Sequence, residues 1–286
     1  MNRIDAHMHY SRIASFIDCA ERTSGVDYSE AGYLRETKES GIVASVCMGL
    51  AESTPASFPD AGAPSPMTAD LAERLPPNVF LCPGVNPHTL TPHGVKALEA
   101  LVGGCDRVVG IKIYAGYYHV DLNDPVYEPV YALAGRHNLT VAIHTGETYS
   151  DRGLLTYSHP LNADRLAVKY PHVRFVLCHM GVPWIFDACD LACKNPNVFV
   201  DLSGLLVGSQ ATIERMAAQP LFIDRYRQAL IFLDSYNKVL LGTDWPLAPM
   251  DPYIRFIERL VPPEEHGCVF YDNALDVYNL RGRIVE

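Results

Sequence analysis

The sequence predicts an α/β protein with the (β/α)8 or TIM-barrel architecture, folded as a single domain over residues 1–286. Eight short apolar runs rich in Val, Ile and Leu recur along the chain, with helix-forming segments between them. A length of 286 residues suits one such barrel, and no composition shift marks a domain boundary. A doubly wound open sheet is the alternative, although no Gly-rich phosphate-binding loop follows the first strand.

The eight predicted strands follow one another in the order expected for parallel strands joined by helical crossovers. Most are continuously apolar until their C-terminal ends, which is typical of strands covered by helices. The runs are 3–9, 41–50, 78–87, 108–116, 139–147, 173–181, 197–205 and 238–246.

Helix starts are visible between these runs. Thr91 before Pro92 and Asp124 before Pro125 each predict an N-cap followed by proline in the first turn. Residues 51–67, rich in Pro, Ser and Ala, follow the second strand and would lie on the catalytic face of a barrel. A mobile lid and a passive insertion are both consistent with that stretch.

Composition excludes several classes of protein. Hydrophobic residues make up 48% and charged residues 20%, as in a globular protein with an ample core. The formal charge of −10 argues against electrostatic binding of nucleic acid or of an anionic membrane surface. We find no secretory signal pattern and no apolar run long enough to span a membrane, so a cytoplasmic protein is expected.

The eight cysteines are too dilute for a disulfide scaffold, and none forms a CxxC pair. Ile185, Cys189 and Cys193 belong to a helical apolar repeat, which predicts that both thiols are buried.

The chemistry is indicated by polar residues at the strand ends. His7 and His9 close the first strand, His144 the fifth, His179 the sixth and Asp244 the eighth. C-terminal strand ends converge on the mouth of a barrel, where active sites of this fold are built. Each residue alone could be a core histidine or a turn former, but together they are the donors that a Zn²⁺-type ion takes.

Lys112 in the fourth strand alternates with Ile111 and Ile113. If the isoleucines pack against helices, the lysine points into the barrel. A buried ammonium needs a carboxylate, a substrate or a chemical modification. An ion pair with Asp5 or Asp201 is the structural alternative to a functional role.

Five ordered motifs, DAHMH, GIKIY, AIHTGE, LCHMG and GTDWP, resemble those of the amidohydrolase superfamily. They are most similar to its amidohydrolase-related branch, which includes aminocarboxymuconate semialdehyde decarboxylase and related hydrolases and lyases. The resemblance runs from Asp5 to about Leu280.

The resemblance implies one divalent metal, Zn²⁺ first and Mn²⁺ or another transition metal as alternatives. His7, His9 and His144 would be ligands, and Asp244 would bind the metal or face its water. His179 matches a position that acts as a catalytic acid or base, orients substrate, or binds a second metal in binuclear relatives. Lys112 matches a position that is carboxylated in those relatives, so a second metal remains open.

The function expected is that of a metal-dependent hydrolase that uses activated water on a small amide, lactone or ester, with Asp244 as proton acceptor. The alternative is a nonoxidative decarboxylase of a small aromatic or unsaturated carboxylic acid, in which Arg152 would hold the carboxylate. A barrel that binds a ligand without catalysis is a third class, and exposed helices would allow a homodimer. Residues at or just beyond strand ends could line a pocket for a small-molecule substrate: Tyr114, Glu147, Tyr149, Arg152, Trp184, Ser203 and Trp245.

Overall fold

The structure is a computed structural model that describes residues 1–11, 13–50 and 75–285. The stretch 51–67, for which a lid or an insertion was expected, lies outside the described residues. No helix in the described ranges is long and apolar enough to cross a membrane.

Nine strands, all paired in parallel, account for the eight predicted runs within the described residues. The third run is divided at Pro83 into β3 and β4, so the later strands carry numbers one higher than their runs. Proline has no backbone N–H and therefore interrupts a strand ladder. The strands are β1 Arg3–Met8, β2 Ile42–Met48, β3 Val79–Cys82, β4 Gly84–Val85, β5 Gly110–Ile113, β6 Thr140–His144, β7 Arg174–Cys178, β8 Val198–Asp201 and β9 Val239–Leu240.

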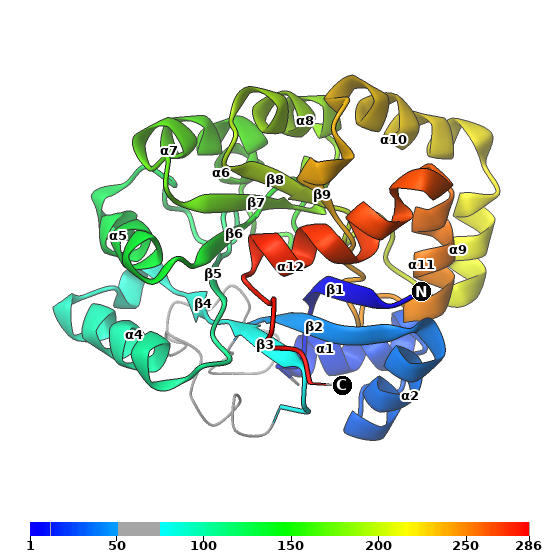
Figure 1. Ribbon diagram of the computed structural model, residues 1–286, viewed down its shortest axis with the longest axis horizontal. Coiled ribbons are helices and arrows are strands. Elements are labelled where there is room, and N and C mark those ends of the chain that lie inside the picture. Colours follow the sequence, from blue (N-terminus) through cyan, green and yellow to red (C-terminus); the bar gives the residue numbers. More distant parts are fainter. Residues whose placement is uncertain (12, 51–74, 286) are drawn as a thin grey trace.

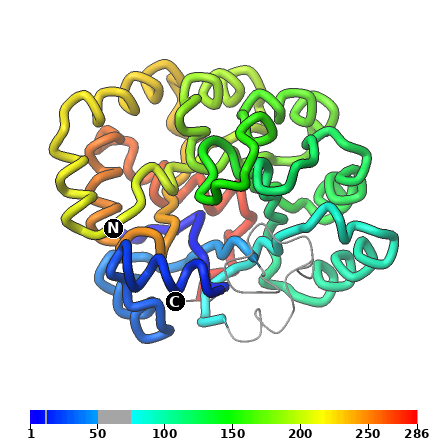
Figure 2. The backbone as a smooth tube through the Cα atoms, turned by 180° about the vertical axis from the view of Figure 1, so that it is seen from behind, coloured from blue at the N-terminus to red at the C-terminus, as the bar shows by residue number. Residues whose placement is uncertain are grey.

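The strands form two hydrogen-bonded sheets, β1-β2-β3 and β4-β5-β6-β7-β8-β9. Backbone bonds connect their edges: the amide of Val109 donates to Leu81 at 3.0 Å, and the amide of Ala6 donates to Leu241 at 2.8 Å. The chain is therefore the single TIM barrel that the sequence predicted, and its helices lie around the strands in both views (Figures 1 and 2).

The α-helices are α1 Ala14–Cys19, α2 Glu30–Ser40, α4 Pro92–Gly104, α5 Glu128–His137, α6 Leu155–Ser158, α7 Asp164–Lys169, α8 Ile185–Lys194, α9 Gln210–Ala217, α10 Pro220–Leu233, α11 Met250–Glu258 and α12 Asn273–Val277. Short 3-10 segments are η2 Pro87–Thr89, η3 Pro125–Tyr127, η4 Pro160–Ala163, η5 His179–Gly181, η6 Tyr236–Lys238 and η7 Pro263–Glu265, and π segments are η1 Ala20–Ser24 and η8 Cys268–Asp272.

Both predicted N-caps are confirmed. The Thr91 hydroxyl accepts a hydrogen bond from the amide of Gly94 at 3.3 Å at the start of α4. The Asp124 carboxylate accepts one from the amide of Val126 at 2.9 Å at the start of η3, which leads directly into α5.

Side-chain alternation along the strands divides the core into two layers. On β6, Val141 and Ile143 join the large cluster between strands and helices, whereas Ala142 belongs to a second cluster. That cluster collects alternate side chains from strands around the barrel together with α12, so it fills the barrel interior. Figure 1 shows α12 lying across the strands.

The prediction for the α8 cysteines is half correct. All eight cysteines are free, and Cys189 is buried, but Cys193 is exposed. The buried stripe of α8 also includes Leu191, which moves its centre away from Cys193.

Candidate metal centre

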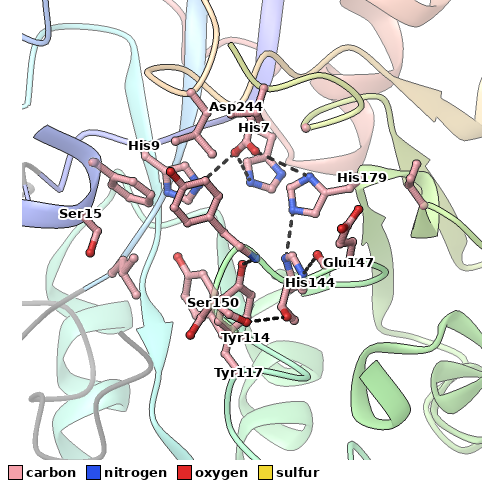
Figure 3. A pocket seen from close by; sticks show the side chains of 18 of the residues that line it. His7, His9, Ser15, Tyr114, Tyr117, His144, Glu147, Ser150, His179 and Asp244 are labelled. Atoms are coloured by element: carbon pink, nitrogen blue, oxygen red, sulfur yellow. Dashed lines mark hydrogen bonds and ion pairs between the residues drawn. The ribbon is translucent and has the colours of Figure 1, made fainter. Parts of the chain in front are cut away.

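The C-terminal ends of the strands surround a cavity of about 680 Å³. His7 and His9 lie at the end of β1, His144 ends β6, His179 follows β7, and Asp244 follows β9. All five side chains line this cavity and point toward its interior (Figure 3). The barrel thus brings together residues separated by more than 200 positions in the sequence, because parallel strands all end at the same rim.

Asp244 lies beside both histidines at the end of β1. Its Oδ1 lies 3.0 Å from Nε2 of His9 and 3.4 Å from Nε2 of His7. Among the described residues, Nε2 of His7 and Oδ1 of Asp244 are buried without a hydrogen-bond partner. Buried polar atoms are rarely left unsatisfied, so two such atoms facing one another indicate a site for a cation.

The other nitrogen of each β1 histidine has an acceptor beside it. Nδ1 of His7 lies 2.8 Å from the Asp201 carboxylate, and Nδ1 of His9 lies 3.1 Å from the carbonyl of Met48. Acceptors at Nδ1 require the proton there, which leaves a lone pair on each Nε2. Nε2 lone pairs beside a carboxylate are a suitable donor set for a divalent transition metal.

The loop that carries Asp244 is tied to β1 through a buried carboxylate. Asp5 accepts hydrogen bonds from the amides of His7 at 3.2 Å and Thr243 at 3.0 Å, and from the Thr243 hydroxyl at 2.5 Å. The amide of Asp244 donates to the carbonyl of His7 at 2.8 Å, and Asp244 has a left-handed φ of 59°. Burial raises the pKa of Asp5 to about 7.

His144 and His179 lie in contact on another side of the cavity. Nε2 of His179 is 3.0 Å from Nδ1 of His144, and Nε2 of His144 is 3.0 Å from the carbonyl of Glu147. His144 belongs to neither group of three or more donor atoms that lie within 4.8 Å of one another in the described structure. Those groups are His7 with His9 and Asp244, and His7 with His179 and Asp201.

Burial sets the charge of these groups. Desolvation lowers the pKa of His7 to about 4, and it also lowers the pKa values of His144 and His179. Burial opposes ionisation of Asp244, but its interactions with His179, His9 and His7 outweigh burial and hold its pKa well below the usual range. Neutral imidazoles beside an ionised carboxylate are the protonation state in which these groups bind metals.

Lys112 points into the barrel as predicted, and it lines the cavity with 1% of its surface exposed. Its ammonium group donates to the sulfur of Cys178 at 2.9 Å. No ion pair to Asp5 or Asp201 occurs in the described part of the chain, so the expected structural alternative is not found. Burial raises the pKa of the Cys178 thiol well above its ordinary value, so the thiol keeps its proton in this contact.

The expected pocket residues divide into two groups. Tyr114, Glu147 and Tyr149 line the cavity. Arg152, Trp184, Ser203 and Trp245 are not among the described lining residues, which corrects the expectation for each of them.

Each excluded side chain lies in other surroundings. The Trp245 indole is buried against Tyr28 and Tyr33, and its N–H donates to Glu36 at 3.2 Å. Trp184 packs against His159, and Arg152 is exposed. These three residues follow a turn, beyond which strand alternation no longer determines side-chain direction.

Sequence reasoning missed the role of two buried residues behind the histidines. Asp201 ends β8 and accepts from His7, and Ser203 lies within 3.0 Å of ring nitrogens of both His7 and His179. The polar segment DLS at the end of a strand was the available signal. From the sequence, Asp201 is expected only as a partner for Lys112, and Ser203 only as a residue of the pocket wall.

Comparison with known proteins gives a family match and several similar folds. A family model described as amidohydrolase matches residues 4–280. A 65-residue stretch is 42% identical to protein fluG of Emericella nidulans, but it covers 23% of this chain and only 7% of that protein.

Three solved structures illustrate the similarity in fold. An uncharacterized TIM-barrel protein from Bordetella bronchiseptica superposes with a TM-score of 0.73 at 19% identity, covering 99% of this chain and 100% of that one. A probable 2-pyrone-4,6-dicarboxylic acid hydrolase from Acinetobacter baumannii gives 0.64 at 16% identity, covering 98% and 100%. The 5-carboxyvanillate decarboxylase of Sphingomonas paucimobilis also gives 0.64 at 16% identity, covering 99% of each chain.

Proposed function

The chain belongs to the amidohydrolase family of metal-dependent enzymes, and we propose that it is a hydrolase of a small, uncharged amide, lactone or ester. The observation that carries this proposal is the pair of buried, unsatisfied atoms, Nε2 of His7 and Oδ1 of Asp244, at the base of the cavity. A carboxylate held beside imidazole lone pairs is suited both to binding a cation and to accepting a proton from water.

The residues present fit one divalent ion, and Zn²⁺ is our first choice because the donors are imidazole nitrogens and a carboxylate. His7, His9, His144 and Asp244 would hold it. When bound, such an ion polarises a carbonyl group and lowers the pKa of water.

The protein side chains supply the proton transfers. Asp244 is ionised at neutral pH because its pKa lies well below the usual range, so it can accept a proton from the attacking water. The same carboxyl group then returns the proton to the leaving atom. His179, whose Nδ1 lies 3.9 Å from Oδ2 of Asp244, remains neutral beside it and so does not neutralise the carboxylate.

The charge of the cavity wall supports an uncharged substrate. Lys112 is the only Lys or Arg side chain among the described lining residues, and its ammonium group already contacts Cys178. Arg152, which a carboxylic acid substrate was expected to use, is not one of them. Decarboxylation of a carboxylate substrate would therefore have to rely on Lys112 and the metal alone.

A nonoxidative decarboxylase is the second candidate, and two observations favour it. Lys112 lies at the cavity wall, and the rings of Phe16, Tyr114 and Tyr117 line the same space, where they could pack against a planar substrate.

Isotope labelling separates the two reactions. Zn²⁺- or Mn²⁺-loaded protein would be screened against lactones, esters, amides and aromatic carboxylic acids in H₂¹⁸O. We expect ¹⁸O in the product of a lactone, ester or amide and no release of CO₂. Release of CO₂ without ¹⁸O uptake would identify a decarboxylase and overturn the proposal.

A further inference from the structure

We propose that Ser203 is a positioning residue of the metal centre, because its hydroxyl fixes the tautomer of His179 and so turns the Nε2 lone pair of that ring toward His144. The inference rests on the metal site proposed above. It depends on a count of protons along a continuous line of hydrogen bonds behind the cavity.

The line begins at the carboxylate of Asp201, which is fully buried. Its Oδ2 faces Nδ1 of His7 at 2.8 Å. Its Oδ1 accepts from the amides of His179 at 2.9 Å and Ser203 at 3.0 Å, and also from the Ser203 hydroxyl. A serine hydroxyl has one proton, so once it donates to Asp201 the oxygen can only accept from other groups.

His179 comes next. Its Nδ1 lies 2.9 Å from the hydroxyl oxygen of Ser203 and 3.2 Å from the carbonyl oxygen of the same residue. Both atoms are acceptors, so Nδ1 must carry the proton of the neutral ring. Nε2 of His179 then keeps a lone pair, which faces Nδ1 of His144 at 3.0 Å.

Nε2 of His144 lies 3.0 Å from the carbonyl of Glu147, which can only accept, so the proton of that ring belongs on Nε2 and Nδ1 keeps a lone pair. Two lone pairs then face each other, on Nε2 of His179 and Nδ1 of His144, and they repel each other unless a cation lies beside them. The Nδ1 protons of His7 and His9 point to Asp201 and to the Met48 carbonyl, so these rings also keep a lone pair, on Nε2. Ser203 therefore adds the lone pair of His179 to those that the site offers a cation.

The second group of donor atoms, His7 with His179 and Asp201, could be mistaken for a further metal site. Both oxygens of Asp201 already accept hydrogen bonds, and the Nδ1 atoms of both rings have acceptors beside them. These polar atoms of the second group have hydrogen-bond partners, whereas Nε2 of His7 and Oδ1 of Asp244 have none in the described structure.

Nitrogen NMR of the metal-free wild-type protein tests the tautomers directly. At neutral pH, long-range ¹H–¹⁵N spectra should show the Nδ1–H form for His7, His9 and His179. The Nε2–H form at His179 would overturn the inference, and this result does not depend on any variant folding.

Variants test the role of the hydroxyl. In Ser203→Ala, we expect Zn²⁺ affinity to fall about tenfold, as is usual when a partner of a ligating histidine is lost. We also expect the tautomer of His179 to become mixed. Ser203→Thr, which keeps the hydroxyl, should stay within about threefold of wild type on the same scale. Ser45→Ala is the matched control, since Ser45 is also a buried strand serine and its hydroxyl accepts a hydrogen bond from Tyr33 at 2.8 Å.

Affinities would be measured by competition with a chromophoric chelator, and folding by circular dichroism. Wild-type affinity in Ser203→Ala would overturn the inference. A folded Ser203→Thr protein that loses as much affinity as Ser203→Ala would also overturn it, because volume rather than the hydroxyl would then matter. Absence of metal binding by the wild type would instead contradict the proposed function.

Discussion

Gly204 shows how closely individual residues are packed around the metal centre. It has a left-handed φ of 61°, and a Cβ there would lie 2.5 Å from Nδ1 of His179 and 2.8 Å from Oδ2 of Asp244. Gly25 has a similar φ of 69° but open space around it. A comparison of alanine substitutions at the two glycines therefore separates the effect of backbone strain from the effect of a collision between the new Cβ and the site.

We predict that Gly204→Ala and Gly25→Ala both lose about 1 kcal/mol of unfolding free energy, because alanine is strained at a positive φ. Only Gly204→Ala should also lose metal affinity, by about tenfold or more, because it displaces groups that contact the ligands. Zn²⁺ titration and urea unfolding of both variants check this. Equal Zn²⁺ affinity in the two variants would contradict the packing described here.

Asp244 has the central chemical role in the proposed reaction. Asp244→Asn keeps the shape of the side chain but removes the proton acceptor and one anionic metal donor. We expect kcat/KM to fall by about 10²- to 10⁴-fold in metal-loaded protein. Asp251→Asn is the control, because Asp251 is exposed and pairs with Arg255 on α11. A loss smaller than tenfold in Asp244→Asn would show that another group accepts the proton.

At this scale the sequence predicted which histidines come together, because alternation and strand ends determine where His7, His9 and His144 point. It could not predict that Trp245 turns away, since the left-handed backbone of Asp244 redirects the chain. Nor could it predict the role of Ser203, which depends on hydrogen bonds between residues that follow three different strands.

At the scale of elements, α12 closes the barrel interior. Leu275 on this helix is 6% exposed and joins the cluster of inward-facing strand residues. The apolar runs predicted the strands well, since parallel strands buried on both faces need continuous apolar sequence. The role of α12 in filling the barrel could not be predicted, because it is a tertiary contact between the chain end and many strands.

We predict that Leu275→Ala lowers the free energy of unfolding by about 2–5 kcal/mol, because it opens a cavity in the barrel interior. Leu221→Ala on α10 is the matched control, since Leu221 is 86% exposed and should change stability by less than about 0.5 kcal/mol. Urea unfolding measures both. Similar losses in the two variants would mean that α12 does not seal the core.

At the scale of the whole molecule, the metal centre makes stability depend on pH. Burial lowers the pKa of His7 to about 4 and also lowers the pKa values of His144 and His179. The unfolded chain therefore binds more protons than the folded one between about pH 4 and 6.5, so stability falls as pH falls through this range. Asp5, with a pKa raised to about 7, and Glu36, whose pKa burial also raises, act in the opposite direction, so the net fall in stability rests on the three histidines together.

We predict that metal-free protein is less stable at pH 5 than at pH 7, with roughly 2 kcal/mol of the difference coming from His7 alone. Urea unfolding in the presence of a chelator measures this. Saturating Zn²⁺ should raise the unfolding free energy at pH 7, because only the folded state assembles the site. Greater stability of the metal-free protein at pH 5 would contradict the buried, neutral state of these histidines.

The central claim is that the barrel gathers the imidazoles of His7, His9 and His144 and the carboxylate of Asp244 around one divalent ion. Anomalous diffraction at the zinc edge, from crystals grown with Zn²⁺, tests this most directly. We predict one peak per chain, bounded by those four groups. A map with no peak among them, or with a second peak beside Lys112, would contradict the claim.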